Sequence, residues 1–356
     1  IELGFAQLSL PCSDDSGDQL ALGVVDVPGH ADFVKNMVAG VGAIDLALFI
    51  VAADDGWMPQ TEEHYQILNY LGVKQAIIAL TKSDIAEELE LVIEDVADNL
   101  KGGKWEDAPV IPVSSHTGDG IQELRDKISQ LLSETPLPVD NGKPRLPVDR
   151  AFSIKGAGTV VTGTLTGGQM KVGSDLVVQP SGASASVRST QSHSQSEDSV
   201  ASGSRCAVNL TGVSLREAKG GNKDTVGRGD VLVPPGLGEG VLAIDVLLTK
   251  FDRDIRGVKA ASRPMQTGRE VMFHYGSCGV LARVHLLEGR KLEPGETMLA
   301  ELRFHEPIFV FAMDRFVLRD ASMGATLAGG IVLDEDANRR AFRKPFQRLF
   351  LDARRE

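Results

Sequence analysis

The chain has 356 residues, which is enough for two or three domains, each with its own hydrophobic core. Its longest apolar run, residues 46–53, is too short to cross a bilayer, which argues against a membrane protein. The three cysteines, Cys12, Cys206 and Cys278, are scattered and lack metal-site spacing, which favours reduced thiols. We therefore expect a cytoplasmic protein with no contact with a membrane, and we expect a monomer.

The net charge of −12 is distributed unevenly along the chain. Residues 1–143 contain 8 Lys and Arg against 25 Asp and Glu, whereas residues 144–356 contain 29 against 24. Nucleic-acid phosphates are bound by clustered cations, so a nucleic acid should contact mainly the second half. The asymmetry could equally serve only solubility, and charge alone does not decide between the two.

Residues 1–10 and 20–25 predict two strands that flank a turn. The second strand ends at Asp26, and a Pro-Gly turn then leads to His30; another apolar strand follows at residues 46–53. A carboxylate at a strand end can reach a metal or its waters, and a glycine lets its backbone N–H approach an anion closely. This pattern is typical of a site at the strand ends of a parallel α/β sheet, although an exposed turn is the alternative.

Two further buried strands are predicted at residues 75–80 and 109–113. They end in Thr81-Lys82-Ser83-Asp84 and in Ser114-Ser115, so polar groups again follow strand ends. Ser83 and Asp84 are expected to cap the helix after them. Helices are predicted at residues 60–71, 84–100 and 119–132.

Residues 134–147 contain four prolines, which predicts a linker. The residue pattern changes after this segment. Helical periodicity disappears, and short β-branched runs alternate with glycines. This pattern predicts one all-β barrel over residues 144–237 and a second over residues 238–334. Residues 335–356 are expected to form an Arg-rich tail that is either helical or a linker.

Three of these segments resemble the guanine-nucleotide motifs of translational GTPases, in the same order and with similar spacing. They are Asp26-x-x-Gly29-His30, Thr81-Lys82-x-Asp84 and Ser114-Ser115. The resemblance implies a multidomain protein in which residues 1–143 form an α/β P-loop GTPase-type domain, followed by the two β-barrels. It also implies GTP or GDP and Mg²⁺ as cofactors.

On the phosphate side, the resemblance implies that Asp26 holds Mg²⁺ through water and that the N–H of Gly29 binds the γ-phosphate. His30 would be the catalytic residue that orients the attacking water, in place of the glutamine of other GTPases.

On the base side, the resemblance implies that Asp84 accepts the guanine N1–H and amino group, while the stem of Lys82 lies along the ring. Backbone N–H groups at Ser114 and Ser115 would meet the guanine O6. Thr81 stands where most of the family has Asn, which removes one amide near the base.

The sequence has no Gly-x-x-x-x-Gly-Lys-Ser/Thr loop, and Gly102-Gly103-Lys104 is not one, because its first glycine is missing. In the family, this P-loop and the first switch precede a stretch that resembles Ile1-Glu2-Leu3-Gly4-Phe5. We therefore expect an N-terminally truncated GTPase domain and weak nucleotide binding by this chain alone.

The run from Val148 to Thr164 resembles the second domain of the selenocysteine-specific elongation factors more closely than that of elongation factor Tu. By position, the resemblance implies an aminoacyl pocket that contains Asp149, Arg150 and Arg205, with His193 as a further candidate.

The chemistry of the amino acid agrees with such a pocket. A selenol is more acidic than a thiol, so selenocysteine arrives as an anion, whereas serine on the same tRNA is neutral. Two guanidinium groups favour the anion, and Asp149 would orient them. Salt bridges on the barrel surface are the alternative explanation of these residues.

The function implied by the resemblance is GTP-dependent delivery of selenocysteinyl-tRNA to the ribosome at recoded UGA codons, with ribosome-triggered GTP hydrolysis. An mRNA hairpin would be bound by C-terminal domains outside this chain, and cationic side chains of the second barrel could contact tRNA phosphates. Two alternatives remain open: a general aminoacyl-tRNA carrier like elongation factor Tu, or a non-hydrolysing scaffold protein without a P-loop. The cationic candidates are Arg283, His285, Arg303, His305, Arg315 and Arg319.

Overall fold

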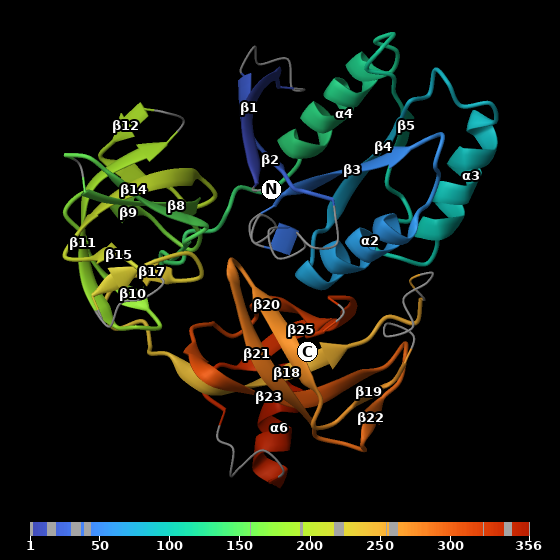
Figure 1. Ribbon diagram of the computed structural model, residues 1–356. Helices are drawn as coiled ribbons and strands as arrows, with labels where there is room; N and C mark the ends of the chain where they lie inside the picture. The colour runs from blue at the N-terminus through green and yellow to red at the C-terminus, as the bar shows by residue number, and fades with distance from the viewer. Residues whose placement is uncertain are drawn as a thin grey trace.

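The computed structural model consists of an α/β unit followed by two β units, which confirms the predicted fold class (Figure 1). His30 and His193, two of the predicted site residues, lie outside the described part of the chain. Within that part, no helix is both long and apolar enough to cross a bilayer. The structure describes residues 3–12, 19–29, 37–38, 44–156, 158–192, 195–216, 224–253, 255, 263–322, 324–337 and 344–355.

The α/β unit is built on a parallel three-stranded sheet with strand order β3-β4-β5. Strand β4 alternates between two cores, because successive side chains of a strand point to opposite faces. Ile78 and Leu80 pack toward α2 and α3, while Ile77 and Ala79 pack toward Leu124 of α4. The elements are β3 (Leu46–Ala52), α2 (Pro59–Leu71), β4 (Gln75–Thr81), α3 (Leu89–Leu100), β5 (Val110–Pro112) and α4 (Ile121–Ser133).

One edge of this sheet is open in the described part of the chain. Strand β3 lies at the end of the strand order and pairs there only with β4. Its side chains Leu48 and Ile50 are 44% and 54% exposed, respectively, which is high for apolar residues of a sheet. An exposed apolar edge strand of this kind is a surface that further structure can cover.

The first two strands form a separate antiparallel hairpin, β1 (Gly4–Pro11) and β2 (Gln19–Asp26). The expectation that the strand ending at Asp26 shares the parallel sheet of residues 46–53 is wrong for the described residues, where β2 pairs only with β1. The hairpin is instead held by α4, whose Ser129 hydroxyl donates to the Pro11 carbonyl. The predicted strands are thus present, but their sheet partner differs.

The second unit is a curved antiparallel sheet with strand order β6-β17-β10-β11-β14-β8-β7, and β12 pairs with β11. Its inward-facing side chains form one core that includes Leu146, Val161, Val208 and Leu232. Two short pairs, β9 with β13 and β15 with β16, complete the unit. The strands are β6 (Leu146–Pro147), β7 (Arg150–Ile154), β8 (Gly158–Thr164), β9 (Met170–Lys171), β10 (Asp175–Gln179), β11 (Ala183–Ser192), β12 (Gln195–Glu197), β13 (Ser199–Val200), β14 (Arg205–Thr211), β15 (Ser214–Leu215), β16 (Thr225–Val226) and β17 (Val231–Val233).

The third unit is a closed barrel with strand order β18-β23-β21-β20-β24-β25. Phe273 lies at its centre, with the ring centroids of Phe304 and Phe316 each 5.1 Å away. The last helix, α6 (Pro345–Ala353), packs its buried Leu351 against the outside of the barrel. The strands are β18 (Val241–Thr249), β19 (Met265–Gln266), β20 (Glu270–Tyr275), β21 (Cys278–Leu286), β22 (Lys291–Leu292), β23 (Thr297–Ile308), β24 (Arg315–Asp320) and β25 (Thr326–Asp334).

One predicted helix start is wrong. Helix α3 begins at Leu89, and neither Ser83 nor Asp84 caps it, because turns occupy the residues between them and the helix. Its N-cap is Glu88, whose side chain makes no capping hydrogen bond. Hydrogen bonds of the strand-end loop hold Ser83 instead, since its N–H donates to the Val113 carbonyl at 3.3 Å.

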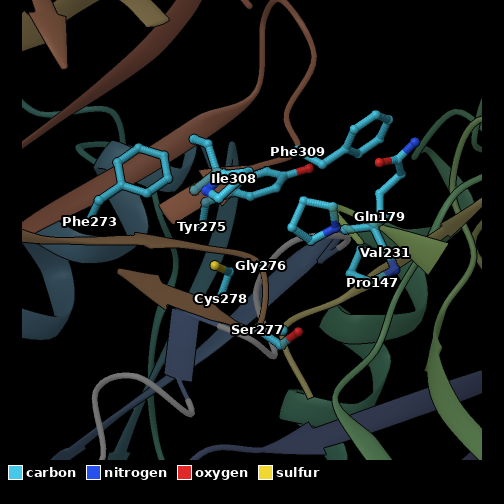
Figure 2. Close-up of a pocket in the computed structure, with 13 residues that line it drawn as sticks. Pro147, Gln179, Val231, Phe273, Tyr275, Gly276, Ser277, Cys278, Ile308 and Phe309 are labelled. Carbon is cyan, nitrogen blue, oxygen red and sulfur yellow. The ribbon is translucent and has the colours of Figure 1, made fainter. Parts of the chain in front are cut away.

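The two β units meet in a tight interface (Figure 2). Tyr275 and Cys278 of the third unit face Pro147 and Val231 of the second around a cavity of about 20 Å³, which has room for about one water molecule. Arg145 of the second unit donates to the Tyr275 hydroxyl at 3.3 Å, and both of its terminal nitrogens donate to Asp314 of the third unit, at 2.8 and 2.6 Å. Dense packing and a bidentate ion pair fix the two β units against each other.

Candidate functional site

The predicted phosphate-side residues lie at the end of the β1–β2 hairpin. Asp26 is the last residue of β2 and is exposed, and its cross-strand partner is Gly4. A Cβ on Gly4 would lie 3.0 Å from the Cβ of Asp26 and 3.2 Å from its Oδ2, closer than side chains normally approach. The absence of a side chain at Gly4 therefore leaves the space that the Asp26 carboxylate occupies at the exposed end of the hairpin.

A histidine that the sequence analysis missed lies beside Gly29. The imidazole Cε1 of His64, on α2, is 3.6 Å from the position that a Cβ of Gly29 would occupy. Burial is the main cause that lowers the pKa of His64, while its hydrogen bond with the Gly29 backbone acts in the opposite direction. A neutral imidazole is thus expected at pH 7. The signal that could have identified this residue is its place on the first helix after an acid-rich strand-end loop.

The predicted base-side residues follow β4. The Thr81 hydroxyl donates to the Val51 carbonyl at 3.4 Å, and Lys82 has a φ of 59°, a left-handed conformation that turns the chain away from the strand. The ammonium of Lys82 lies 2.6 Å from Asp54 Oδ2, a residue of the loop after β3. This hydrogen bond is the main cause that lowers the pKa of Asp54 and raises that of Lys82. Asp54 was not predicted, although it follows an apolar strand as Asp26 does.

Ser114 has a structural role in the loop after β5. It is 1% exposed, its hydroxyl accepts hydrogen bonds from the N–H groups of His116 and Thr117, and its own N–H donates to the Asp119 carbonyl. The Ser114 N–H is thus already engaged within the loop, and its contact with a base remains a prediction. Ser115, the next residue, is exposed at the surface of the same loop.

The ends of the three parallel strands bring these loops to one edge. The N–H of Ala53, after β3, donates to the Thr81 carbonyl, and the N–H of Ser83 donates to the Val113 carbonyl. Asp54, Asp84 and Ser115 belong to these adjoining loops. This edge is where parallel α/β sheets bind ligands, because the loops at the carboxyl ends of the strands converge there.

A second cluster lies between the second unit and the hairpin. Arg205 of β14 binds Asp149 with both terminal nitrogens, at 2.5 and 3.1 Å. The Thr162 hydroxyl also donates to Asp149, at 2.6 Å, and this carboxylate is only 8% exposed. The three predicted residues Asp149, Arg150 and Arg205 are therefore brought together, since Arg150 follows Asp149 directly and is the cross-strand partner of Thr162.

The hairpin closes this cluster from the other side. Arg150 donates to the Leu3 carbonyl at 2.6 Å, and the ring of Phe5 lies 3.4 Å from the Cζ of Arg205 and 5.2 Å from that of Arg150. A ring face over a guanidinium is a cation–π contact. Phe5 was not predicted, since no local pattern connects a strand near residue 5 with a barrel beyond residue 144.

The cluster brings two guanidinium groups together between two parts of the chain. One of them, Arg205, is paired with the Asp149 carboxylate. The neighbouring Cys206 points into the barrel core, and burial raises the pKa of its thiol to about 12, so the thiol does not supply a nucleophile here. The cluster can therefore bind an anion but has no reactive group of its own among these residues.

The chain matches two family models. Residues 2–134 match the elongation factor Tu GTP-binding domain, and residues 252–339 match the beta-barrel domain of selenocysteine-specific elongation factor. Elongation factor 1-alpha of Methanobrevibacter smithii is 32% identical over 348 residues, with 87% of this chain and 80% of that protein covered. The chain belongs to the translation elongation factor family of GTPases. The site loops of this elongation factor are therefore those of a translational GTPase domain.

Within this family, the chain resembles the selenocysteine-specific factors over nearly all of its length. The factor of Desulfomicrobium baculatum is 40% identical over 336 residues, with 94% of this chain and 50% of that protein covered. A crystal structure of translation elongation factor SelB from Methanococcus maripaludis with the GTP analogue GppNHp has a TM-score of 0.78 and 26% identity, covering 96% of this chain and 75% of that one. The chain spans about half the length of the selenocysteine-specific relatives that it matches.

Proposed function

We propose that the protein containing this chain is a GTP-dependent elongation factor that carries selenocysteinyl-tRNA to the ribosome at recoded UGA codons, where GTP is hydrolysed. The observation that carries this proposal is the cluster of Asp149, Arg150, Arg205 and Phe5, which brings two guanidinium groups together between the second unit and the hairpin. The similarity to selenocysteine-specific factors supports it along nearly the whole chain. An mRNA hairpin would be bound by parts of the protein outside this sequence.

The nucleotide would lie at the edge formed by the strand-end loops. The exposed Asp26, opposite Gly4, fits a carboxylate that faces a Mg²⁺ ion through water, and Gly29 leaves its backbone open to a phosphate. Bound Mg²⁺ would neutralise phosphate charge during hydrolysis. His30, next to Gly29, would orient the attacking water, while Thr81, Lys82 and Asp84 would hold the base.

The P-loop is absent from this sequence, so the chain by itself supplies only part of this site. Among the described residues, the edge of β3 is open and its side chains Leu48 and Ile50 are exposed, which leaves room for further structure beside β3. Titration of this chain with fluorescent GDP should show weak binding, and affinity equal to that of intact GTPases would contradict this proposal.

The aminoacyl group would lie against the guanidinium groups. Asp149 holds Arg205 in one orientation, so the guanidinium is ordered before the ligand arrives. An anionic selenolate would gain from the two guanidinium groups, whereas a neutral serine side chain would gain much less. Phe5 covers the guanidinium groups and limits water around them, which strengthens the discrimination by charge.

Protection of the ester bond tests this proposal. The full-length protein with GTP should slow hydrolysis of selenocysteinyl-tRNA but not of seryl-tRNA on the same tRNA body. Arg205→Ala should abolish the difference, whereas Arg216→Ala, which removes the partner of Asp230 elsewhere in the second unit, should retain it. Equal protection of both esters would indicate a general carrier, which the similarity to elongation factor 1-alpha makes the second candidate. Protection of neither would indicate a non-hydrolysing scaffold.

A further inference from the structure

An acidic row, made of Asp245, Glu301 and Asp334, crosses three neighbouring strands of the third unit. Asp245 of β18 has Glu301 of β23 as its cross-strand partner on one side and Asp334 of β25 on the other. Like charges placed directly opposite each other destabilise a sheet. Asp245 and Glu301 are also fully buried, so water does little to screen the repulsion between them. The acidic row is therefore unfavourable while all of its carboxyl groups are ionised.

The acidic row lies on the outer face of the barrel, beneath α6. Successive side chains of a strand point to opposite faces, and both sequence neighbours of Asp245 belong to the core inside the barrel. On the outer face, Leu351 of α6 packs against Leu299 and Leu333, which lie on β23 and β25. The same helix therefore covers both an apolar patch and the acidic row.

One side chain of α6 joins the helix to the acidic row. The amide nitrogen of Gln347, which is 6% exposed, donates to Asp245 Oδ2 at 2.8 Å and to Asp334 Oδ2 at 3.2 Å. An amide nitrogen carries two N–H groups, so these two contacts use both of them. Gln347 therefore has no further N–H to offer Glu301.

Two buried oxygens of the acidic row, Asp245 Oδ1 and Glu301 Oε2, have no hydrogen-bond partner among the described residues. The other oxygen of Glu301 accepts from Arg303. An unpaired buried acceptor is costly, because it has lost its water without gaining a partner. A proton on Asp245 turns one acceptor into a donor, which a neighbouring carboxylate can accept, whereas two ionised carboxylates cannot hydrogen-bond each other.

The charges around Asp245 come from every element packed against it. Burial is the main cause that raises the pKa of Asp245 to about 7, and the carboxylates of Glu301 and Asp334 raise it further. The hydrogen bond from Gln347 and the charge of Arg303 act in the opposite direction. The position that α6 covers is therefore the position at which a proton is retained most readily.

The charged contacts of α6 are more exposed than the contact of Gln347. Arg348 pairs with Glu288, and the two side chains are 55% and 51% exposed. Arg354, just after the helix, lies 3.8 Å from Glu335, again at the surface. Water competes with such pairs, so they contribute little to holding the helix. Docking of α6 therefore depends mainly on the buried Gln347 and Leu351.

We propose that Asp245 and Gln347 form a proton-dependent contact that docks α6 on the outer face of the third barrel. With a proton on Asp245, the acidic row carries less charge and Gln347 bridges it. Without that proton, three carboxylates surround one amide group, and α6 leaves the barrel while the barrel stays closed. Release would expose the apolar surface of Leu299 and Leu333. This contact involves neither the proposed nucleotide site nor the proposed aminoacyl pocket.

Hydrogen exchange of α6 in this chain tests the contact, with rates expressed as protection factors so that the intrinsic pH dependence of exchange cancels. Because the pKa of Asp245 is raised in the docked state, docking is strongest when Asp245 is protonated and weakens as the pH rises to about 7. Protection of residues 348–353 should fall roughly tenfold between pH 5 and pH 7.5. At pH 7.5, the amides of β20 should remain more protected than those of α6. Equal protection would show that α6 opens only when the barrel unfolds, and would overturn the proposal.

A pair of matched variants identifies the titrating group. Asp245→Asn removes the proton-binding site and retains an acceptor for Gln347, so protection of α6 should change by less than about twofold over the same pH range. Asp352→Asn makes the same change at a partly exposed position of α6 and should keep the tenfold fall. A fall in Asp245→Asn as large as that of the parent chain, or no fall in the parent chain, would contradict the proposal.

Gln347→Glu tests the other half of the contact. It places a further carboxyl group against the acidic row, so α6 should lose roughly threefold to tenfold more protection than the parent chain at pH 7.5. At pH 5, where the carboxyl groups take up protons more readily, the difference from the parent chain should be smaller. Protection equal to that of the parent chain at pH 7.5 would show that Gln347 does not hold the helix.

Discussion

Each of the two candidate sites contains a cation–carboxylate pair, and the surroundings of the pairs are opposite. Asp149 and Arg205 are joined by two hydrogen bonds within the second unit, with the carboxylate 8% exposed and the ring of Phe5 from the hairpin over the guanidinium. Asp54 and Lys82 are joined by one contact, and their side chains are 34% and 48% exposed. The buried pair is ordered before any ligand arrives, whereas water competes for the exposed pair and lets Lys82 change partner. The ordered Asp149–Arg205 pair suits a pocket that selects its ligand by charge, whereas the exposed Asp54–Lys82 pair suits a loop that binds a base.

The largest expected effect comes from breaking the buried pair. Asp149→Ala leaves the Arg205 guanidinium partly buried without its carboxylate and the Thr162 hydroxyl without its acceptor. We expect a loss of about 3 to 4 kcal/mol in the free energy of unfolding, measured by urea denaturation of this chain. Asp175→Ala, which removes an exposed hydrogen bond to Ser186 in the same sheet, is the control and should change stability by less than about 0.5 kcal/mol. A loss as small as the control's would show that the pair is no more than a surface salt bridge.

A buried carboxyl without a bidentate cation sharpens the comparison. Asp245 of β18 is fully buried opposite Glu301 and Asp334, and Gln347 of α6 donates to it at 2.8 Å. Burial is the main cause that raises its pKa to about 7.

Because this pKa is raised in the folded state, stability is highest when Asp245 is protonated in both states, and it is lost as the pH rises from about 4 to about 7. Asp245→Asn should remove that loss and raise the free energy of unfolding at pH 8 by on the order of 2 kcal/mol. Urea denaturation between pH 4 and pH 8 measures the free energy of unfolding of the variant and the parent chain. Asp336→Asn is the control, because Asp336 is exposed. Parallel pH profiles of Asp245→Asn and the parent chain would contradict the assignment.

The smallest expected effect comes from the exposed pair. Asp54→Ala should leave the urea midpoint unchanged within error, because water and salt already compete with the contact between Asp54 and Lys82. The pKa of Lys82 should fall, since the Asp54 hydrogen bond is its main cause of elevation, and NMR titration of the ammonium measures this. A clear drop in the midpoint would show that the loop after β3 depends on the pair.

Much of the fold could be predicted from local patterns. The periods of residues 60–71 and 75–80 correspond to α2 and β4, and the alternation after residue 144 indicated β structure. The start of α3 could not be predicted, because Ser83 is a plausible N-cap by composition but is held by Val113 of a neighbouring loop. A serine can either cap a helix or hydrogen-bond within a loop, and the residues that surround it in the folded protein decide which of the two occurs.

The candidate sites divide in the same way. Asp26, Thr81 and Asp84 were predicted because a motif of fixed spacing contains them, and their proposed nucleotide roles remain predictions. Phe5 and His64 were missed, since each acts across a gap in the sequence that no local period spans. Ser114 was predicted as a ligand, yet its hydrogen bonds build the turn.

By itself, the sequence determined where most of the strands and helices lie, the order of the three motifs and the division into one α/β and two β units, because these depend on residues close together along the chain. Only the tertiary structure decided that β2 pairs with β1 alone among the described strands, and that Arg150 meets the Leu3 carbonyl across 147 positions. Only the tertiary structure attached α2 to the third unit through Glu63. The physical reason is that these contacts join residues far apart in the sequence. Which groups pair with a buried charge or an open strand edge depends on how the units pack against one another.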